Sequence, residues 1–100
     1  MRIFISSPYK GDVEANMRMA SGIAATILAE GHIPVVPHWA HHWLEWEVND
    51  DKLRDDFAMI LCESDIDTVD EVWSFGAPTD GMIQEQNYAR RIGKKVVPRG

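Results

Sequence analysis

The sequence predicts a single α/β domain built on a small parallel sheet of the Rossmann-like or flavodoxin-like kind. The length of 100 residues fits one domain, which we expect to span residues 1–100. Short apolar segments alternate with segments of helical periodicity, in the order β-α-β-α-β-α-β. Such alternation requires parallel strands joined by right-handed crossovers, with helices on both faces. We expect about four strands in the spatial order 2-1-3-4.

The first half of the chain contains two expected strands and one long helix. Residues 2–6 form a short apolar strand that ends at Ser-Ser-Pro. Residues 12–30 carry apolar side chains at i, i+3 and i+4 spacing, which is typical of a helix with one buried face. Gly31 is its expected stop, and residues 33–36 form a second strand, which Pro34 keeps short.

The second half begins with an ambiguous segment that is rich in tryptophan and histidine. Residues 38–50 are compatible with a loop or with a short helix. The remaining elements are expected to be a helix at 51–63, a strand at 70–75, a helix at 81–92 capped by Thr79 or Asp80, and a strand at 95–97.

Composition excludes several classes of partner. The net charge of −6 and the absence of a basic stripe argue against nucleic-acid polymers. No apolar run approaches the roughly 20 residues of a membrane span, and the chain opens directly on a strand, so we expect neither a membrane anchor nor a signal peptide. Cys62 is the single cysteine, which precludes an intrachain disulfide. We interpret Cys62 as buried packing and expect a cytoplasmic protein.

Two turns are expected to meet at the carboxyl ends of neighbouring strands, where parallel sheets bind ligands. One follows the first strand within residues 3–9, and the other opens the helix that contains Glu85. The positive end of that helix should favour an ionised Glu85, and an ionised glutamate at a ligand site acts as a nucleophile or a base. A helix-stabilising surface glutamate is the alternative.

The same turns offer groups that bind small polar ligands. Gly81 allows close backbone approach, so that free N–H groups can hold an anion or a hydroxyl, and Thr79 adds a hydroxyl donor. Tyr9 can stack on a ring or form a hydrogen bond with a sugar or a carboxylate. The alternatives are ordinary helix capping for Thr79 and Gly81 and a half-buried structural role for Tyr9.

The Trp/His-rich segment (residues 38–46) raises the question of a metal. Structural zinc sites usually contain cysteines or well-separated pairs of ligands, and the chain has neither HExxH nor CxxC. We therefore expect no metal and no cofactor, and we interpret the segment as a flap or an interface. The side chains that raise the question are His38, His41, His42 and Glu45 in this segment and Glu47 directly after it.

Five features stand in a fixed order along nearly the whole chain. They are the strand, small-residue turn and aromatic at 3–9, Asn16, the turn Gly31-x-x-Pro34, Asp70 at the third strand, and Thr79-x-Gly81-x-x-x-Glu85 followed by Ala89 and Gly93-Lys94. In this order and spacing they resemble the nucleoside 2-deoxyribosyltransferase-like superfamily, which includes the 2′-deoxynucleoside 5′-phosphate N-hydrolases. The chain is most similar to small members of that group.

The resemblance implies a role for each matching position. Glu85 matches the glutamate that attacks the anomeric carbon and forms a glycosyl-enzyme, and Tyr9 matches an aromatic that positions sugar and nucleophile. Asp56, with Asp55 as the alternative, matches an aspartate that holds or protonates the base. Thr79 matches the residue that meets the 5′ end of the sugar, where a hydroxyl residue is typical of the phosphate hydrolases. The other positions implied to bind substrate are Ser6, Ser7, Pro8, Asn16, Gly81 and Met82.

The resemblance also implies an activity and an assembly. The expected reaction is cleavage of the N-glycosidic bond of a 2′-deoxynucleoside 5′-monophosphate or a deoxynucleoside, by hydrolysis or by deoxyribosyl transfer, through a covalent glycosyl-glutamate. Relatives complete each site from a neighbouring subunit, so we expect a homodimer or a higher homo-oligomer. Ser7 stands where glycine is more usual. The alternatives are a non-catalytic nucleotide-binding or sensing module and an interaction protein that uses the Trp/His-rich segment.

Overall fold

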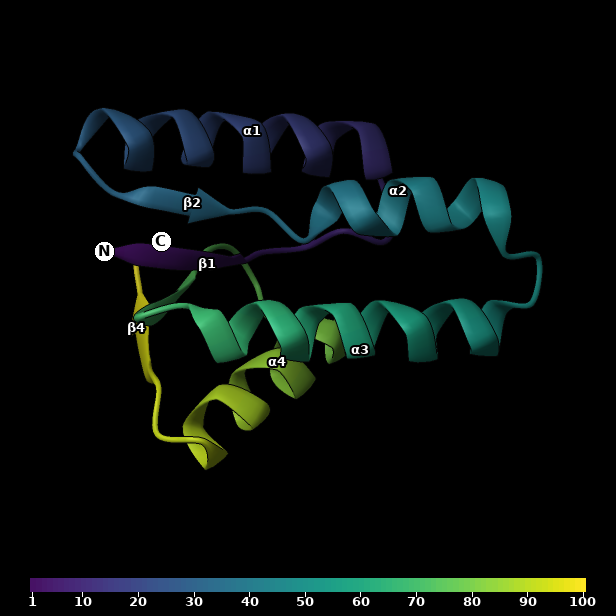
Figure 1. Ribbon diagram of the computed structural model, residues 1–100. Coiled ribbons are helices and arrows are strands. Elements are labelled where there is room, and N and C mark those ends of the chain that lie inside the picture. The colour runs from purple at the N-terminus through teal and green to yellow at the C-terminus, as the bar shows by residue number, and fades with distance from the viewer.

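The computed structural model describes residues 1–100 and contains a four-stranded parallel sheet (Figure 1). The strand order is β2-β1-β3-β4, and every neighbouring pair is parallel. The predicted fold class and strand order are therefore confirmed. The elements are β1 (Arg2–Ser6), α1 (Val13–Ala29), β2 (Ile33–Val35), α2 (His38–Glu47), α3 (Asp51–Thr68), β3 (Glu71–Ser74), α4 (Asp80–Arg91) and β4 (Lys95–Pro98).

Helices cover both faces of the sheet, with α1 on one side and α3 and α4 on the other (Figure 1). Alternation along β1 produces this arrangement, because successive side chains of a strand point to opposite faces. Ile3 and Ile5 are fully buried in a cluster with Ile27 of α1. Phe4, between them, is fully buried in a second cluster with Ile66 of α3. The two apolar clusters fix β1 at the centre of the domain.

The structure resolves one ambiguous segment and extends one predicted helix. The ambiguous residues after β2 form a helix, α2. The helix expected at 51–63 continues to Thr68, because Ile66 follows Cys62 by one turn on the same face and both side chains are buried in one cluster. Neither glycine nor proline interrupts residues 63–68. None of the helices combines the length and apolarity needed to cross a membrane.

The start of α4 is fixed by its N-cap. Of the two residues considered, Thr79 is the cap, since its Oγ accepts a hydrogen bond from the backbone N–H of Met82 at 3.2 Å. This end of α4 lies beside the carboxyl end of β1. The strand order reverses at β1, because β2 pairs with one edge of β1 and β3 pairs with the other. Such a switch in strand order is the usual location of a ligand site in a parallel sheet.

Candidate active site

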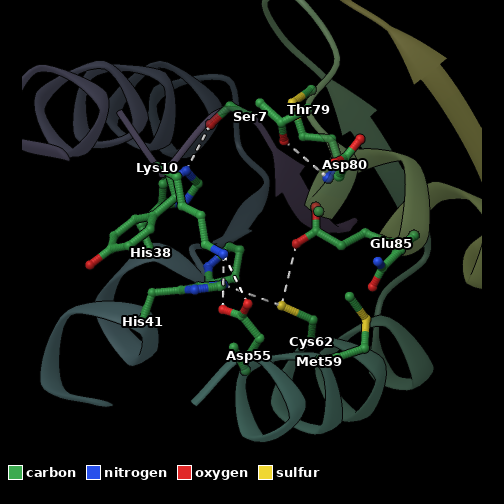
Figure 2. Close-up of a pocket in the computed structure, with 16 residues that line it drawn as sticks. Ser7, Lys10, His38, His41, Asp55, Met59, Cys62, Thr79, Asp80 and Glu85 are labelled. Carbon is green, nitrogen blue, oxygen red and sulfur yellow. Dashed lines mark hydrogen bonds and ion pairs between the residues drawn. The ribbon is translucent and has the colours of Figure 1, made fainter. Parts of the chain in front are cut away.

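A cavity of about 470 Å³ opens at this switch point (Figure 2). Four parts of the chain line it: the turn after β1, the start of α2, one face of α3 and the first turns of α4. A cavity of this size accommodates a small organic ligand. The sixteen lining residues are Ser7, Tyr9, Lys10, Pro37, His38, His41, Asp55, Ala58, Met59, Cys62, Thr79, Asp80, Gly81, Met82, Gln84 and Glu85.

Glu85 is a buried carboxylate in the wall of the cavity. Its side chain is only 6% exposed, and both oxygens accept hydrogen bonds. The Ser6 hydroxyl donates to Oε1 at 3.0 Å, and the Cys62 thiol donates to Oε2 at 3.3 Å. Burial raises the pKa of Glu85 to about 7, because the desolvation of the carboxylate outweighs these two hydrogen bonds. With a pKa of about 7, Glu85 is about half ionised at neutral pH.

The field of the helix N-terminus, which was expected to favour ionised Glu85, does not hold its pKa at or below the ordinary value. The favourable field of a helix end falls off beyond the first turn, and α4 begins at Asp80, so Glu85 lies in the second turn. Desolvation therefore sets the protonation of this group. A buried carboxyl group with a pKa near neutrality, located in a cavity, is typical of a functional site.

A short chain of hydrogen bonds fixes the direction of the Ser6 contact. The Gln86 amide donates to the Ser6 Oγ at 3.1 Å and to the Ser74 Oγ at 3.0 Å. Since the Ser6 oxygen accepts from Gln86, its single proton is available to Glu85. The ends of β1 and β3 thus hold Glu85 through side chains that the sheet itself positions.

His38 organises the turn after β1. Its Nε2 lies 3.0 Å from the Ser7 Oγ and 3.2 Å from the Pro8 carbonyl oxygen. Because a carbonyl can only accept, Nε2 carries the proton, and Nδ1 is a buried lone pair without a partner. Burial lowers the pKa of His38, so the ring is neutral. Ser7 and His38 therefore hold this turn through their side chains.

Tyr9 and His41 pack against each other on the α2 side of the cavity. Their ring centroids are 4.7 Å apart, and Tyr9 is 8% exposed. Burial and the nearby Glu45 carboxylate raise the pKa of Tyr9, so the phenol keeps its proton. Burial lowers the pKa of His41 to about 4, so its ring is neutral at neutral pH. The His41 Nε2 lies 3.8 Å from the Cys62 Sγ.

Of the two aspartates considered for base recognition, Asp55 lines the cavity and Asp56 does not. Asp55 pairs with Lys10 at 3.0 Å, across the space between α3 and the turn after β1. Asp56 instead pairs with Lys52 at 2.9 Å on the exposed side of α3. The reason is helical register: Asp55 and Cys62 are seven residues apart and share a face, whereas Asp56 is turned about 100° away.

The remaining positions implied by the sequence divide into two groups. Thr79, Gly81 and Met82 line the cavity with Ser7, Tyr9 and Glu85, and Ser6 contacts Glu85. Asn16 and Pro8 do not line it. The Asn16 amide donates to the carbonyls of Tyr9 at 3.0 Å and Lys10 at 3.1 Å, so Asn16 shapes the turn that presents those residues.

The Trp/His-rich segment has two faces. His38 and His41 line the cavity, whereas Trp39, Trp43 and Trp46 on α2 are 55%, 47% and 71% exposed. None of these histidines was expected in a ligand site from the sequence, and Cys62 was expected to serve in buried packing. No local pattern could have shown that His41, Cys62 and Glu85, which come from three helices, bring their donor atoms within 4.8 Å of one another.

One family model matches almost the entire chain. It is described as "Domain of unknown function (DUF7768)" and matches residues 1–99. No curated protein matches the sequence significantly.

Solved structures share the fold at low sequence identity. One is described as a 2-deoxyribosyltransferase from the psychrotolerant bacterium Bacillus psychrosaccharolyticus. It has a TM-score of 0.69 and 17% identity, over 98% of this chain and 71% of that one. Another is described as a 2-desoxiribosyltransferase from Leishmania mexicana, with a TM-score of 0.63 and 14% identity, over 97% of this chain and 62% of that one. At these identities the similarity establishes a common fold.

Proposed function

Because this chain belongs to the family described as "Domain of unknown function (DUF7768)", we propose its function from its site: cleavage of the N-glycosidic bond of a 2′-deoxynucleoside 5′-monophosphate or a deoxynucleoside. Glu85 is the proposed nucleophile. The observation that carries the proposal is a carboxylate only 6% exposed, held by Ser6 and Cys62 in the wall of a cavity of about 470 Å³. Burying an ionisable carboxyl group lowers the stability of the fold at neutral pH, and such groups with a pKa near 7 cluster at functional sites.

The fold supports this assignment. Both structural neighbours described above are named as deoxyribosyltransferases, and one is named as a biocatalyst for nucleoside synthesis. The resemblance seen in the sequence leads independently to the same class, through Tyr9, Thr79, Gly81 and Glu85. All four residues line the same cavity.

The proposed reaction has two steps. A Glu85 carboxylate oxygen forms a bond to C1′ while the C1′–N bond breaks, and the electron pair of that bond leaves with the base. Positive charge develops on the sugar in the transition state, and the adjacent carboxylate stabilises it. We propose that Asp55, in the cavity wall, holds the leaving base. Water or a second base then attacks C1′ and frees Glu85, so that two displacements retain the anomeric configuration.

The direct test is chromatographic detection of free base from a panel of deoxynucleosides and their 5′-monophosphates, with and without an acceptor base. Release of base by the wild-type protein supports the proposal. Release that needs an acceptor indicates transfer, and release in water alone indicates hydrolysis. Thermal stabilisation by nucleotides without any release would replace the proposal with the non-catalytic binding module.

Asp55 and Asp56 provide a matched pair of variants. Asp55→Asn should lower kcat/KM for base release by at least about tenfold, the size expected when a charge-assisted hydrogen bond is lost. Asp56→Asn removes the same charge from the neighbouring position, outside the cavity, and should have a much smaller effect. Steady-state kinetics of the two variants measure the difference, and a larger loss for Asp56→Asn would refute the placement of Asp55.

Thr79 is proposed to meet the 5′ end of the substrate, and charge tests that role. Thr79→Asp keeps a good N-cap for α4 but places a negative charge where a 5′-phosphate would lie. We expect kcat/KM for monophosphates to fall at least about tenfold relative to that for deoxynucleosides, because like charges in a binding site repel strongly. Thr79→Ser, which keeps the hydroxyl and the cap, is the control. Equal losses for both substrate classes would remove Thr79 from phosphate recognition.

The homo-oligomer implied by the resemblance stays a prediction. Sedimentation velocity of the purified chain tests it, with a single monomer boundary at all concentrations as the contrary result.

A further inference from the structure

Three side chains with metal-binding atoms converge beside the cavity, one each from α2, α3 and α4. They are His41, Cys62 and Glu85, and their donor atoms all lie within 4.8 Å of one another. The Cys62 Sγ is 3.3 Å from the Glu85 Oε2 and 3.8 Å from the His41 Nε2. Figure 2 shows these side chains directed toward one another.

These separations approach those of ligands around a tetrahedral zinc ion. Zinc bonds of about 2.0–2.3 Å at tetrahedral angles place neighbouring donor atoms roughly 3.3–3.6 Å apart. The Cys62–Glu85 separation of 3.3 Å lies in this range, and the two separations that involve His41 need to shorten. A small rotation of the His41 side chain, which is only half-buried, can provide this movement.

The three donor atoms favour zinc over calcium and magnesium. A thiolate, an imidazole and a carboxylate together suit zinc, whereas calcium and magnesium prefer oxygen ligands alone. Supporting contacts are also present. The Ser6 hydroxyl holds Oε1 of Glu85, which leaves Oε2 facing Cys62, and the Tyr9 ring packs against His41. Such outer contacts orient ligands in established metal sites.

Access is available from the cavity, since all three side chains belong to its lining. Three protein ligands leave the fourth tetrahedral position free, in the arrangement that is usual for zinc sites open to water or to small molecules. The site differs from the histidine and glutamate cluster of the Trp/His-rich segment, because only His41 is common to both.

We propose that His41, Cys62 and Glu85 bind one zinc ion, with its open position facing the cavity, and that bound zinc blocks Glu85. Binding replaces the Cys62 thiol proton by the metal, and that proton passes to solvent. The blocking half of the inference rests on the proposed function: zinc bonded to Oε2 occupies that oxygen and draws negative charge from the whole carboxylate, which weakens Glu85 as a nucleophile toward C1′. The binding half depends only on the three side chains.

The binding test uses Co²⁺ as a spectroscopic probe for the zinc site in the full chain, after treatment with a chelator. We expect one Co²⁺ per chain, a thiolate-to-cobalt charge-transfer band in the near ultraviolet, and loss of that band when Zn²⁺ is added. Cys62→Ser should abolish the band. His41→Asn should weaken metal binding at least about tenfold, since loss of an outer contact alone can cost that much. His42→Asn is the control, because His42 is the next residue of α2 and lies outside the cavity lining.

Several results would overturn the inference. One is a folded wild-type protein that shows no charge-transfer band, and another is a band that persists in both Cys62→Ser and His41→Asn. Circular dichroism establishes that each variant is folded, and if Cys62→Ser is not, the wild-type band and His41→Asn decide the matter.

Base-release assays with added Zn²⁺ and with chelator separate this inference from the proposed function. Cobalt binding without any base release supports the metal site and refutes the proposed function. Base release without cobalt binding does the reverse. If both occur, zinc should suppress release and chelator should restore it; insensitivity to zinc would refute the blocking half.

Discussion

Glu85→Gln is expected to reduce base release by at least about a thousandfold, the scale seen when a nucleophile is removed from a covalent mechanism. Glutamine has nearly the same shape, so the cavity should persist and substrates should still bind. Its amide does not form the glycosyl ester on which the proposed mechanism depends. Kinetics and ligand-induced thermal shifts on the same preparation measure the two properties. Unchanged base release by a clean Glu85→Gln preparation would show that the nucleophile is a different group.

The same substitution should make the fold more stable at neutral pH. Glu85 is 6% exposed, and its raised pKa means that ionising it near pH 7 lowers the free energy of unfolding. Glutamine removes that ionisation and keeps an acceptor oxygen for one of the two donors, Ser6 and Cys62. Glu47→Gln, which removes an exposed carboxylate of α2, is the control and should change stability little. Urea denaturation near pH 7 compares the three proteins.

The kcat/KM for base release should depend steeply on pH. A nucleophilic Glu85 must be ionised, and its pKa is about 7. Below that pH, kcat/KM should fall about tenfold per unit, to about a hundredth of its plateau near pH 5. A deoxynucleoside is the suitable substrate, because a phosphate group itself titrates near pH 6. Chelator keeps metal from the carboxylate during the assay. A flat profile between about pH 5 and pH 7 would contradict the role of Glu85.

Stability should change in the opposite direction over the same range. The folded-state pKa of Glu85 is about 7 and the ordinary value is 4.5, so between these values the folded state holds a proton that the unfolded state has lost. The contribution of Glu85 to stability therefore falls as pH rises from about 4.5 to about 7, by a free energy of unfolding on the order of 3 kcal/mol. In Glu85→Gln this component disappears. The free energy of unfolding of the wild type should therefore fall relative to that of Glu85→Gln between about pH 4.5 and pH 7. If the two proteins showed the same pH dependence across this window, the raised pKa would be refuted.

The fold could be predicted because its signals are local. The apolar strand at residues 2–6, the amphipathic helix that Gly31 ends, and the capped helix at Thr79 each depend on neighbours within a few residues. Their alternation then permits few topologies. The end of α3 could not be placed as well, because Ile66 extends the helix through a tertiary contact in the core.

The site was predictable only in part, for the same reason. Glu85, Tyr9 and Thr79 stand beside turns that the strand ends bring together, and motif spacing locates such turns. The register of α3, which selects Asp55 over Asp56, depends on how that helix rotates against the sheet. The contact of Cys62 with Glu85 and the burial that raises the Glu85 pKa arise from packing between α3 and α4. Because the two residues are 23 positions apart in sequence, no local pattern records them.

We propose that Glu85 forms a covalent bond to the sugar, and trapping that bond is the decisive experiment. The wild-type protein would be incubated with a cleaved deoxynucleoside or monophosphate, quenched in acid, digested and analysed by mass spectrometry. We predict a deoxyribosyl adduct on the peptide that contains Glu85 and none in Glu85→Gln. Base release with no adduct on Glu85, or an adduct on another residue, would contradict the proposed mechanism.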